Sequence, residues 1–129
     1  RVMRQQYHHR TINGDVHIGN VNKLVRQVQG ATPVEIALSE IEELDETFWF
    51  SGMDGNVPTC RAVADHAKLI METDLIYPVL LCPDKRVIDG MHRICKAYIS
   101  GHKTVQAIIL SEMPEPDYMN KNLEELPYD

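Results

Sequence analysis

The sequence predicts an α/β domain of the α+β kind, in which a small mixed sheet has helices packed on it. Three segments repeat apolar residues with helical spacing, and two others are nearly unbroken apolar runs of strand length. At 129 residues the chain is close to the commonest size of a single domain. These observations favour one hydrophobic core that strands and helices build together.

The first 30 residues predict a single helix. Residues 1–19 show no period, and we expect them to be irregular. Asn20 is placed to cap a helix that Gly30 stops. Between them, four apolar residues recur at i, i+3, i+4 and i+7: Val21, Leu24, Val25 and Val28.

The segment from 33 to about 73 predicts a strand, two helices and a loop between them. Residues 33–38 (PVEIAL) alternate like a strand, and Ser39 with Glu42 forms the pattern of a helix capping box. Aromatic residues and glycines predict a loop over 45–57. A helix is expected from Pro58 to about Thr73, with these residues on its apolar face: Val63, Ala67, Ile70 and Met71.

The following segment predicts three strands and one helix. Residues 75–82 (LIYPVLLC) read as a buried strand, and 85–88 (KRVI) as a short strand that pairs back on it. A helix from about Gly90 to Ser100 should stop at Gly101 and turn four residues inward: Met91, Ile94, Cys95 and Tyr98. Residues 104–110 (TVQAIIL) predict the closing strand.

Charge and composition divide the chain into three parts: an irregular basic arm over 1–19, a domain over 20–110 with its core in 33–110, and an acidic tail over 111–129. Residues 1–30 hold five basic residues and one acidic residue, which gives them a net charge of +4. Since the whole chain has a net charge of −6, the other 99 residues have a net charge of −10. This acidic bulk argues against a broad surface that follows nucleic-acid phosphates. The basic arm is either a local contact for an anionic partner or a solvated terminus.

The sequence predicts neither a disulfide framework nor a metal site, and it gives no sign of a membrane partner. The three cysteines lack CxxC spacing, and we expect them to be reduced and mostly buried. No apolar run approaches the roughly 18 residues that a membrane-spanning helix needs, and the first residues do not resemble a signal peptide. The expected location is therefore the cytoplasm.

The turn Asp89, Gly90, Met91, His92, Arg93 is the candidate for binding chemistry. A helix N-terminus offers unpaired backbone N–H groups and a partial positive charge, both of which favour an anion. Gly90 would let a ligand approach the backbone, and three basic side chains follow within the first two turns: His92, Arg93 and Lys96. Since cations at a helix start oppose the helix dipole, a phosphate between them would explain their placement.

An ordinary structural explanation accounts for the same five residues. Asp89 would then be the helix N-cap, Gly90 a turn residue, and the cations a solvated face. Trp49 has a similar pair of interpretations, as a stacking residue for a base or as an anchor of its loop. His66, between apolar positions of the long helix, is expected to be a satisfied or surface histidine.

From Pro33 to Leu110 the chain resembles the ParB/sulfiredoxin-like domain family. The resemblance rests on the order of elements and on the stretch RVIDGMHRICKAYISGHKTVQAIIL, which contains the family's DG-x-H/R-R turn. It implies a ParB/sulfiredoxin-like fold and a nucleotide phosphate site at Gly90, His92 and Arg93, with Lys96 in reach. The implied cofactor is a nucleoside di- or triphosphate (ATP, ADP or CTP) with Mg²⁺.

Departures from the family pattern separate its branches. Sulfiredoxins place a catalytic cysteine where this chain has Met91, and methionine supplies no thiolate, so sulfiredoxin activity is not expected. Partition proteins carry an arginine-rich box and a DNA-binding domain that are not visible here. The serine-kinase branch needs a base and an acid, for which Glu46 and Asp89 are the candidate catalytic residues.

Three functions follow as hypotheses. The first is a nucleotide-binding ParB-like domain, with hydrolysis or phosphotransfer as an extension. The second is a non-catalytic ParB-like adaptor or regulator in DNA partition, which contacts DNA or a DNA-associated protein. The third is a protein-interaction module that uses the aromatic loop and the acidic tail.

Overall fold

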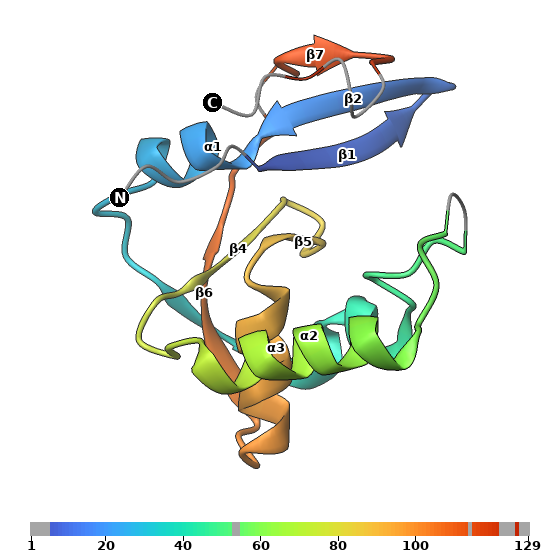
Figure 1. Ribbon diagram of the computed structural model, residues 1–129. Helices are drawn as coiled ribbons and strands as arrows, with labels where there is room; N and C mark the ends of the chain where they lie inside the picture. Colours follow the sequence, from blue (N-terminus) through green and yellow to red (C-terminus); the bar gives the residue numbers. More distant parts are fainter. Residues whose placement is uncertain (1–5, 53–54, 114, 122–125, 127–129) are drawn as a thin grey trace. The chain divides into compact units, whose positions relative to one another are not determined.

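The computed structural model describes residues 6–52, 55–113, 115–121 and 126, and its fold is mixed α+β (Figure 1). This part of the chain forms two sheets and three α-helices. They are divided between two compact units: a hairpin unit, made of Arg1–Ala31 and Glu112–Asp129, and a central unit, Thr32–Ser111. The central unit coincides closely with the predicted core over 33–110, whereas the helix that begins after Asn20 belongs with the hairpin unit.

The hairpin unit contains a three-stranded antiparallel sheet. Strands β1 (Tyr7–Ile12) and β2 (Asp15–Asn20) are joined by Asn13 and Gly14, which both have positive φ (51° and 84°), as a two-residue hairpin turn requires. The expectation that residues 1–19 are irregular is therefore wrong over 7–12 and 15–19, and residues 1–5 lie outside the described part of the chain. These strands are rich in polar residues and show no clear alternation, so the Asn-Gly turn was the only local sign of them.

The acidic tail supplies the third strand of this sheet. Strand β7 (Tyr118–Met119) pairs with β2, so the order is β1-β2-β7. The sequence also suggests one turn of helix in residues 122–126 (NLEEL), but four of these five residues lie outside the described part of the chain. Helix α1 (Val21–Gln27) follows β2, and Asn20 caps it by accepting from the Lys23 N–H at 3.0 Å, as predicted.

The central unit contains a four-stranded mixed sheet of order β3-β6-β4-β5. Strands β3 (Val34–Ala37) and β6 (Thr104–Ile109) are antiparallel, β6 and β4 (Val79–Leu81) are parallel, and β4 and β5 (Val87–Asp89) form the predicted hairpin. Helix α2 spans Cys60–Glu72 and helix α3 spans Met91–Ile99. These two helices and three of the predicted strands are thus confirmed. The buried strand expected over 75–82 is wrong in its first part: β4 begins at Val79, and residues 75–77 form a turn in which Ile76 is 74% and Tyr77 60% exposed.

Helix α3 packs on β4 and β6 and covers the core of the central unit. Its side chains Met91, Ile94 and Ala97 are buried against the sheet. All three residues of β4 are buried, which explains why residues 79–81 are all apolar. The largest fully buried side chains of this core are Ile41, Leu81, Ile94, Val79 and Val87.

Several local predictions in the central unit are wrong. The capping box at Ser39 does not form, because the chain makes two 3₁₀ turns, η1 (Leu38–Glu40) and η2 (Glu42–Asp45), without a side-chain cap. No residue of α2 is buried, and Met71 is 76% exposed, since α2 packs beside α3 and does not lie on the sheet. Tyr98 also faces outward, 66% exposed.

The three cysteines are free, and the expectation that they are mostly buried holds only in part. Cys82 is buried, Cys95 is partly buried and Cys60 is exposed at the start of α2. Within the described residues, no helix combines the length and apolar character needed to cross a bilayer.

Candidate functional site

The turn between β5 and α3 has the geometry of a helix entry that only glycine fits. Gly90 adopts φ +109°, and a Cβ built on it would lie 2.7 Å from the Val79 Cγ1 atom. Gly90 itself is the N-cap of α3, and no side chain caps this helix. The structural alternative that made Asp89 the N-cap is therefore wrong, and the first-turn N–H groups of α3 have no side-chain acceptor.

Arg93 is used inside the fold. Its Nη1 atom donates to the Pro78 carbonyl at 2.9 Å, and its Nη2 atom donates to the Asp89 carboxylate at 3.1 Å. Only 14% of the side chain is exposed. Arg93 thus ties the first turn of α3 to the chain segment that enters β4, and Asp89 is its ion-pair partner.

Lys96 is likewise engaged, at the end of helix α2. Its Nζ atom donates to the carbonyls of Met71 and Thr73. The last carbonyls of a helix have no partner within the helix, and a lysine is well suited to satisfy them. This contact joins α2 to α3, so the ammonium group does not point toward the start of its own helix.

His92 belongs to an aromatic cluster with His66 and Trp49. The His66 Nδ1 and His92 Nε2 atoms lie 2.9 Å apart, so one nitrogen carries the proton that the other accepts. The indole of Trp49 stacks on both imidazoles, at 4.2 Å from His66 and 4.6 Å from His92. Burial, followed by the nearby His66, lowers the pKa of His92 although Asp89 acts to raise it. The neutral imidazole is therefore favoured at pH 7.

This cluster clarifies two residues that the sequence left ambiguous. His66 is a satisfied histidine, as expected, but its partner is a residue of the candidate turn. Trp49 packs against the hydrophobic core, which supports its interpretation as the anchor of the loop. The 26-residue separation of the two histidines explains why no local pattern revealed the pair.

Glu46 lies in a cluster of carboxylates around Arg86. Both of its oxygens accept from the Arg86 guanidinium, at 2.7 and 3.0 Å, and Glu42 accepts from the same group at 2.8 Å. The pKa of Glu46 is lowered, mainly by the hydrogen bond from Arg86. Burial acts to raise this pKa, and the positive charge of Arg86 lowers it further. A carboxylate held in this way is a weak base, so proton abstraction by Glu46 would require the pair to open.

Glu43 is a buried acid that the sequence analysis missed. It is 3% exposed, and its Oε2 atom accepts from the Val87 N–H at 2.6 Å, while its Oε1 atom has no hydrogen-bond partner in the described part of the protein. A buried carboxylate oxygen without a partner is unusual. Glu43 stands in an acidic run that resembles a solvated surface, which is why no local signal distinguished it.

A cavity of about 580 Å³ lies between the aromatic loop and helix α3. Its walls bring together Trp49 and its neighbours in the loop, the acids Glu43 and Glu46, and Met91 and Cys95 of α3. The first residue of α3 therefore lines the cavity. The cavity and the start of the helix form one continuous region of the central unit.

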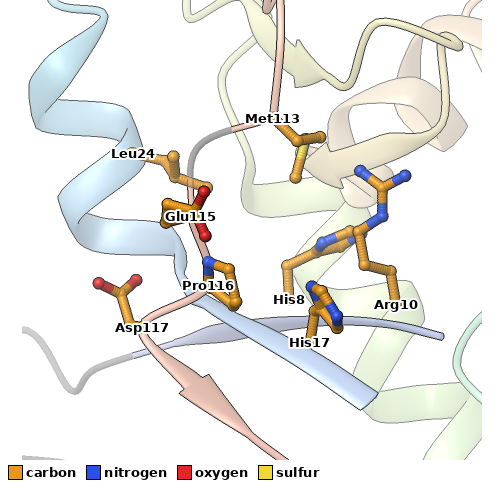
Figure 2. A pocket seen from close by; sticks show the side chains of 9 residues that line it. His8, Arg10, His17, Leu24, Met113, Glu115, Pro116 and Asp117 are labelled. Atoms are coloured by element: carbon orange, nitrogen blue, oxygen red, sulfur yellow. The ribbon is translucent and has the colours of Figure 1, made fainter. Parts of the chain in front are cut away.

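A second pocket, the hairpin pocket, lies within the hairpin unit and measures about 200 Å³ (Figure 2). His8 and Arg10 are two residues apart on β1, and their pairing partners on β2 are Gly19 and His17. Residues in these positions share one face of the sheet, which gathers the three basic side chains around a glycine. Burial, then the charges of Arg10 and His9, lowers the pKa of His8 to about 4.

The opposite wall of the hairpin pocket comes from the C-terminal segment. Met113, Glu115 and Pro116 lie across the pocket from the basic residues, and the carboxylate of Asp117, the fourth residue of this wall, points away from them (Figure 2). Asp117 fixes this segment, because its N–H donates to the Ile18 carbonyl at 2.9 Å and its carboxylate accepts from the Asn20 N–H and the Lys23 ammonium, both at 2.8 Å. The pocket is therefore bounded by paired backbone on both sides.

Among the residues that the structure describes, no three histidine, cysteine or acidic side chains are grouped so that they could hold a metal ion. Comparisons with protein-family models, with curated proteins and with solved structures found no match to this chain. The resemblance to the ParB/sulfiredoxin-like family consequently remains an expectation from the sequence. The site has to be interpreted from its own geometry.

Proposed function

We propose that the central unit is a ParB/sulfiredoxin-like domain that binds the phosphate of a nucleotide at the start of helix α3. One observation carries the proposal: the helix begins at a glycine without a side-chain cap, and its first residue, Met91, lines a cavity of about 580 Å³. Cavities of roughly 300–1,000 Å³ suit small organic ligands. A nucleotide is thus of a suitable size for the cavity beside the uncapped helix.

The geometry changes which groups would contact the phosphate. Arg93 and Lys96 donate to acceptors inside the protein, so they position the turn and the two helices. The phosphate ligands in this proposal are the first-turn backbone N–H groups, whose dipole favours an anion, together with the Nδ1 atom of His92, since its Nε2 atom is paired with His66. The ligand would be ATP, ADP or CTP with Mg²⁺, and magnesium bound through phosphate oxygens and water needs few protein ligands.

Titration of the intrinsic fluorescence of Trp49 tests the proposal, since Trp49 is the sole tryptophan and lines the cavity. Three proteins should be titrated with ATP, ADP and CTP in the presence of Mg²⁺: the parent and the variants His92→Gln and His92→Glu. A glutamate in the first turn interacts favourably with the helix dipole, so it should not weaken the helix, but its negative charge repels a phosphate. We expect His92→Glu to bind at least about tenfold more weakly than His92→Gln. Equal affinity of the two variants, or no saturation by any nucleotide, would contradict the proposal.

Turnover is an extension of the same proposal. Glu46 and Asp89 remain the candidate catalytic residues for hydrolysis or phosphotransfer, although both are ion-paired here. If Glu46 is the base, Glu46→Gln should abolish nucleotide-dependent phosphate release while leaving the affinity for nucleotide nearly unchanged. Loss of turnover and affinity together would instead indicate that the Arg86 cluster supports the fold of the loop.

A protein-interaction module is the second candidate, and the exposure of helix α2 favours it. Large apolar side chains are exposed on α2 and just after it, with Met71 76% and Ile76 74% exposed. Sedimentation over a range of concentrations would test association with a second copy of the chain. Met71→Lys should weaken such association, whereas Lys68→Met, on the same helix, should not. A DNA-binding adaptor is tested separately by gel shift over a range of salt concentrations.

A further inference from the structure

The hairpin pocket contains two charged side chains whose charges are not neutralised by the fold. Arg10 and Glu115 have neither an ion pair nor a side-chain hydrogen bond within the part of the chain that the structure describes. Asp117, the other acid of the pocket, already accepts from Asn20 and Lys23. The pocket therefore offers one unused guanidinium and one unused carboxylate on facing walls (Figure 2).

The chemistry of these two groups limits the ligand. A guanidinium has donors only and binds an oxyanion through two parallel hydrogen bonds. An ionised carboxylate has acceptors only, so Glu115 can hydrogen-bond to the same ligand only through a donor on that ligand. Hydrogen phosphate has both, because it carries charged oxygens and a P–O–H group at neutral pH. Sulfate has acceptors only.

Size and the neighbouring residues point in the same direction. The pocket of about 200 Å³ is smaller than the roughly 300–1,000 Å³ typical of organic-ligand sites, so it suits one small group. His8 and His17 add N–H donors on the same face as Arg10. Gly19 stands opposite His8 and contributes no side chain, which leaves the space open.

We infer that the hairpin pocket binds one protonated oxyanion of the phosphate type, with Arg10 and the two histidines donating to its charged oxygens and Glu115 accepting from its hydroxyl. This site uses the hairpin unit alone and is independent of the nucleotide site proposed at helix α3. Free phosphate keeps a P–O–H group at neutral pH, whereas a phosphomonoester, with a second pKa of about 6, has mostly lost it, so free phosphate fits the site better. Inorganic phosphate is the simplest probe.

NMR of the imidazole signals in the full chain tests this inference. Sodium phosphate and sodium sulfate are titrated at pH 7 and constant ionic strength. The His8 and His17 signals should shift and saturate with phosphate, and sulfate should bind at least about tenfold more weakly. Signals of His66 and His92 report on the α3 site in the same spectra, so the two sites are distinguished directly.

Matched variants separate a built site from general charge attraction. Arg10→Gln should weaken phosphate binding at least about tenfold, whereas Arg26→Gln, an equal charge change at an exposed position of α1, should leave it unchanged. Glu115→Gln should abolish the preference for phosphate over sulfate. Shifts that never saturate, equal effects of the two arginine variants, or an unchanged preference in Glu115→Gln would each overturn the inference. Retained β1 and β2 amide signals show that each variant is folded.

Discussion

The start of helix α3 and the hairpin pocket both gather basic side chains, but they differ in how the donors are used. At α3, Arg93 donates to Pro78 and Asp89, and Lys96 donates to the end of α2. In the hairpin pocket, Arg10 has no such partner among the described residues. The difference teaches that a basic side chain counts as an anion ligand only when its donors remain unused, so at α3 the proposed phosphate ligands are backbone N–H groups and His92 and not Arg93 or Lys96. The four predictions below test this contrast.

The largest effect is expected from Gly90→Ala, because the turn at α3 is sterically fixed. The added Cβ would combine a positive φ with a 2.7 Å approach to Val79, so unfolding free energy should fall by about 2–5 kcal/mol. Gly101→Ala is the control: its φ is +82°, but nothing lies within 4 Å, and about 1–2 kcal/mol should be lost. Urea unfolding followed by Trp49 fluorescence measures both. Equal losses would refute the steric account.

Arg93→Met should give the next largest loss, since it removes two hydrogen bonds at a partly buried site. We expect about 1.5–3 kcal/mol, because the Pro78 carbonyl and the Asp89 carboxylate lose their donor. The same urea unfolding assay applies. Lys68→Met, which breaks only an exposed pair with Glu72 at 3.8 Å, should change stability by less than about 0.5 kcal/mol. If Arg93→Met is as mild as Lys68→Met, Arg93 is not held by the fold.

Asp117→Asn tests the wall of the hairpin pocket and its pH dependence. Burial acts to raise the pKa of Asp117, but the Asn20 N–H bond and Lys23 outweigh it, so the pKa lies below 3.8. The stabilisation from this ionised carboxylate is therefore present above the ordinary pKa and is lost as pH falls through the lowered value. We expect Asn to cost about 0.5–1.5 kcal/mol at neutral pH and nothing in strong acid. Hydrogen exchange of the β2 amides measures the loss of unfolding free energy at neutral pH. NMR-monitored unfolding in strong acid tests whether the loss disappears there.

The smallest effect on stability is expected from Arg10→Gln. Because Arg10 has no partner in the described residues, unfolding free energy should change by less than about 0.5 kcal/mol. Compared with Arg93→Met, this variant tests the contrast between the two regions directly. A loss above about 1 kcal/mol would mean that Arg10, too, is part of the fold. NMR-monitored unfolding of the β1 and β2 amides gives the measurement.

Local sequence patterns were sufficient for most of the central unit. Strands β3 to β6, helices α2 and α3, and the cap of α1 all follow from periodicity and from capping residues, which act between neighbours in sequence. Gly90 was also identified locally, as a turn residue or as a point where a ligand can approach the backbone, whereas its positive φ and its proximity to Val79 came from the structure. The same patterns were insufficient where a segment was polar, as in β1 and β2.

What only the tertiary structure decided is the partner of each functional group. Glu46 and Arg86 are 40 residues apart, His66 and His92 are 26 apart, and Lys23 and Asp117 are 94 apart. Spacing along the chain carries information about contacts within a helix turn or a strand pair, but not about which surfaces pack together. By itself, therefore, the sequence determined most elements of the central unit and the turn at Asp89–Arg93. Packing decided that the cations of that turn are used within the fold, while those of the hairpin pocket face a cavity.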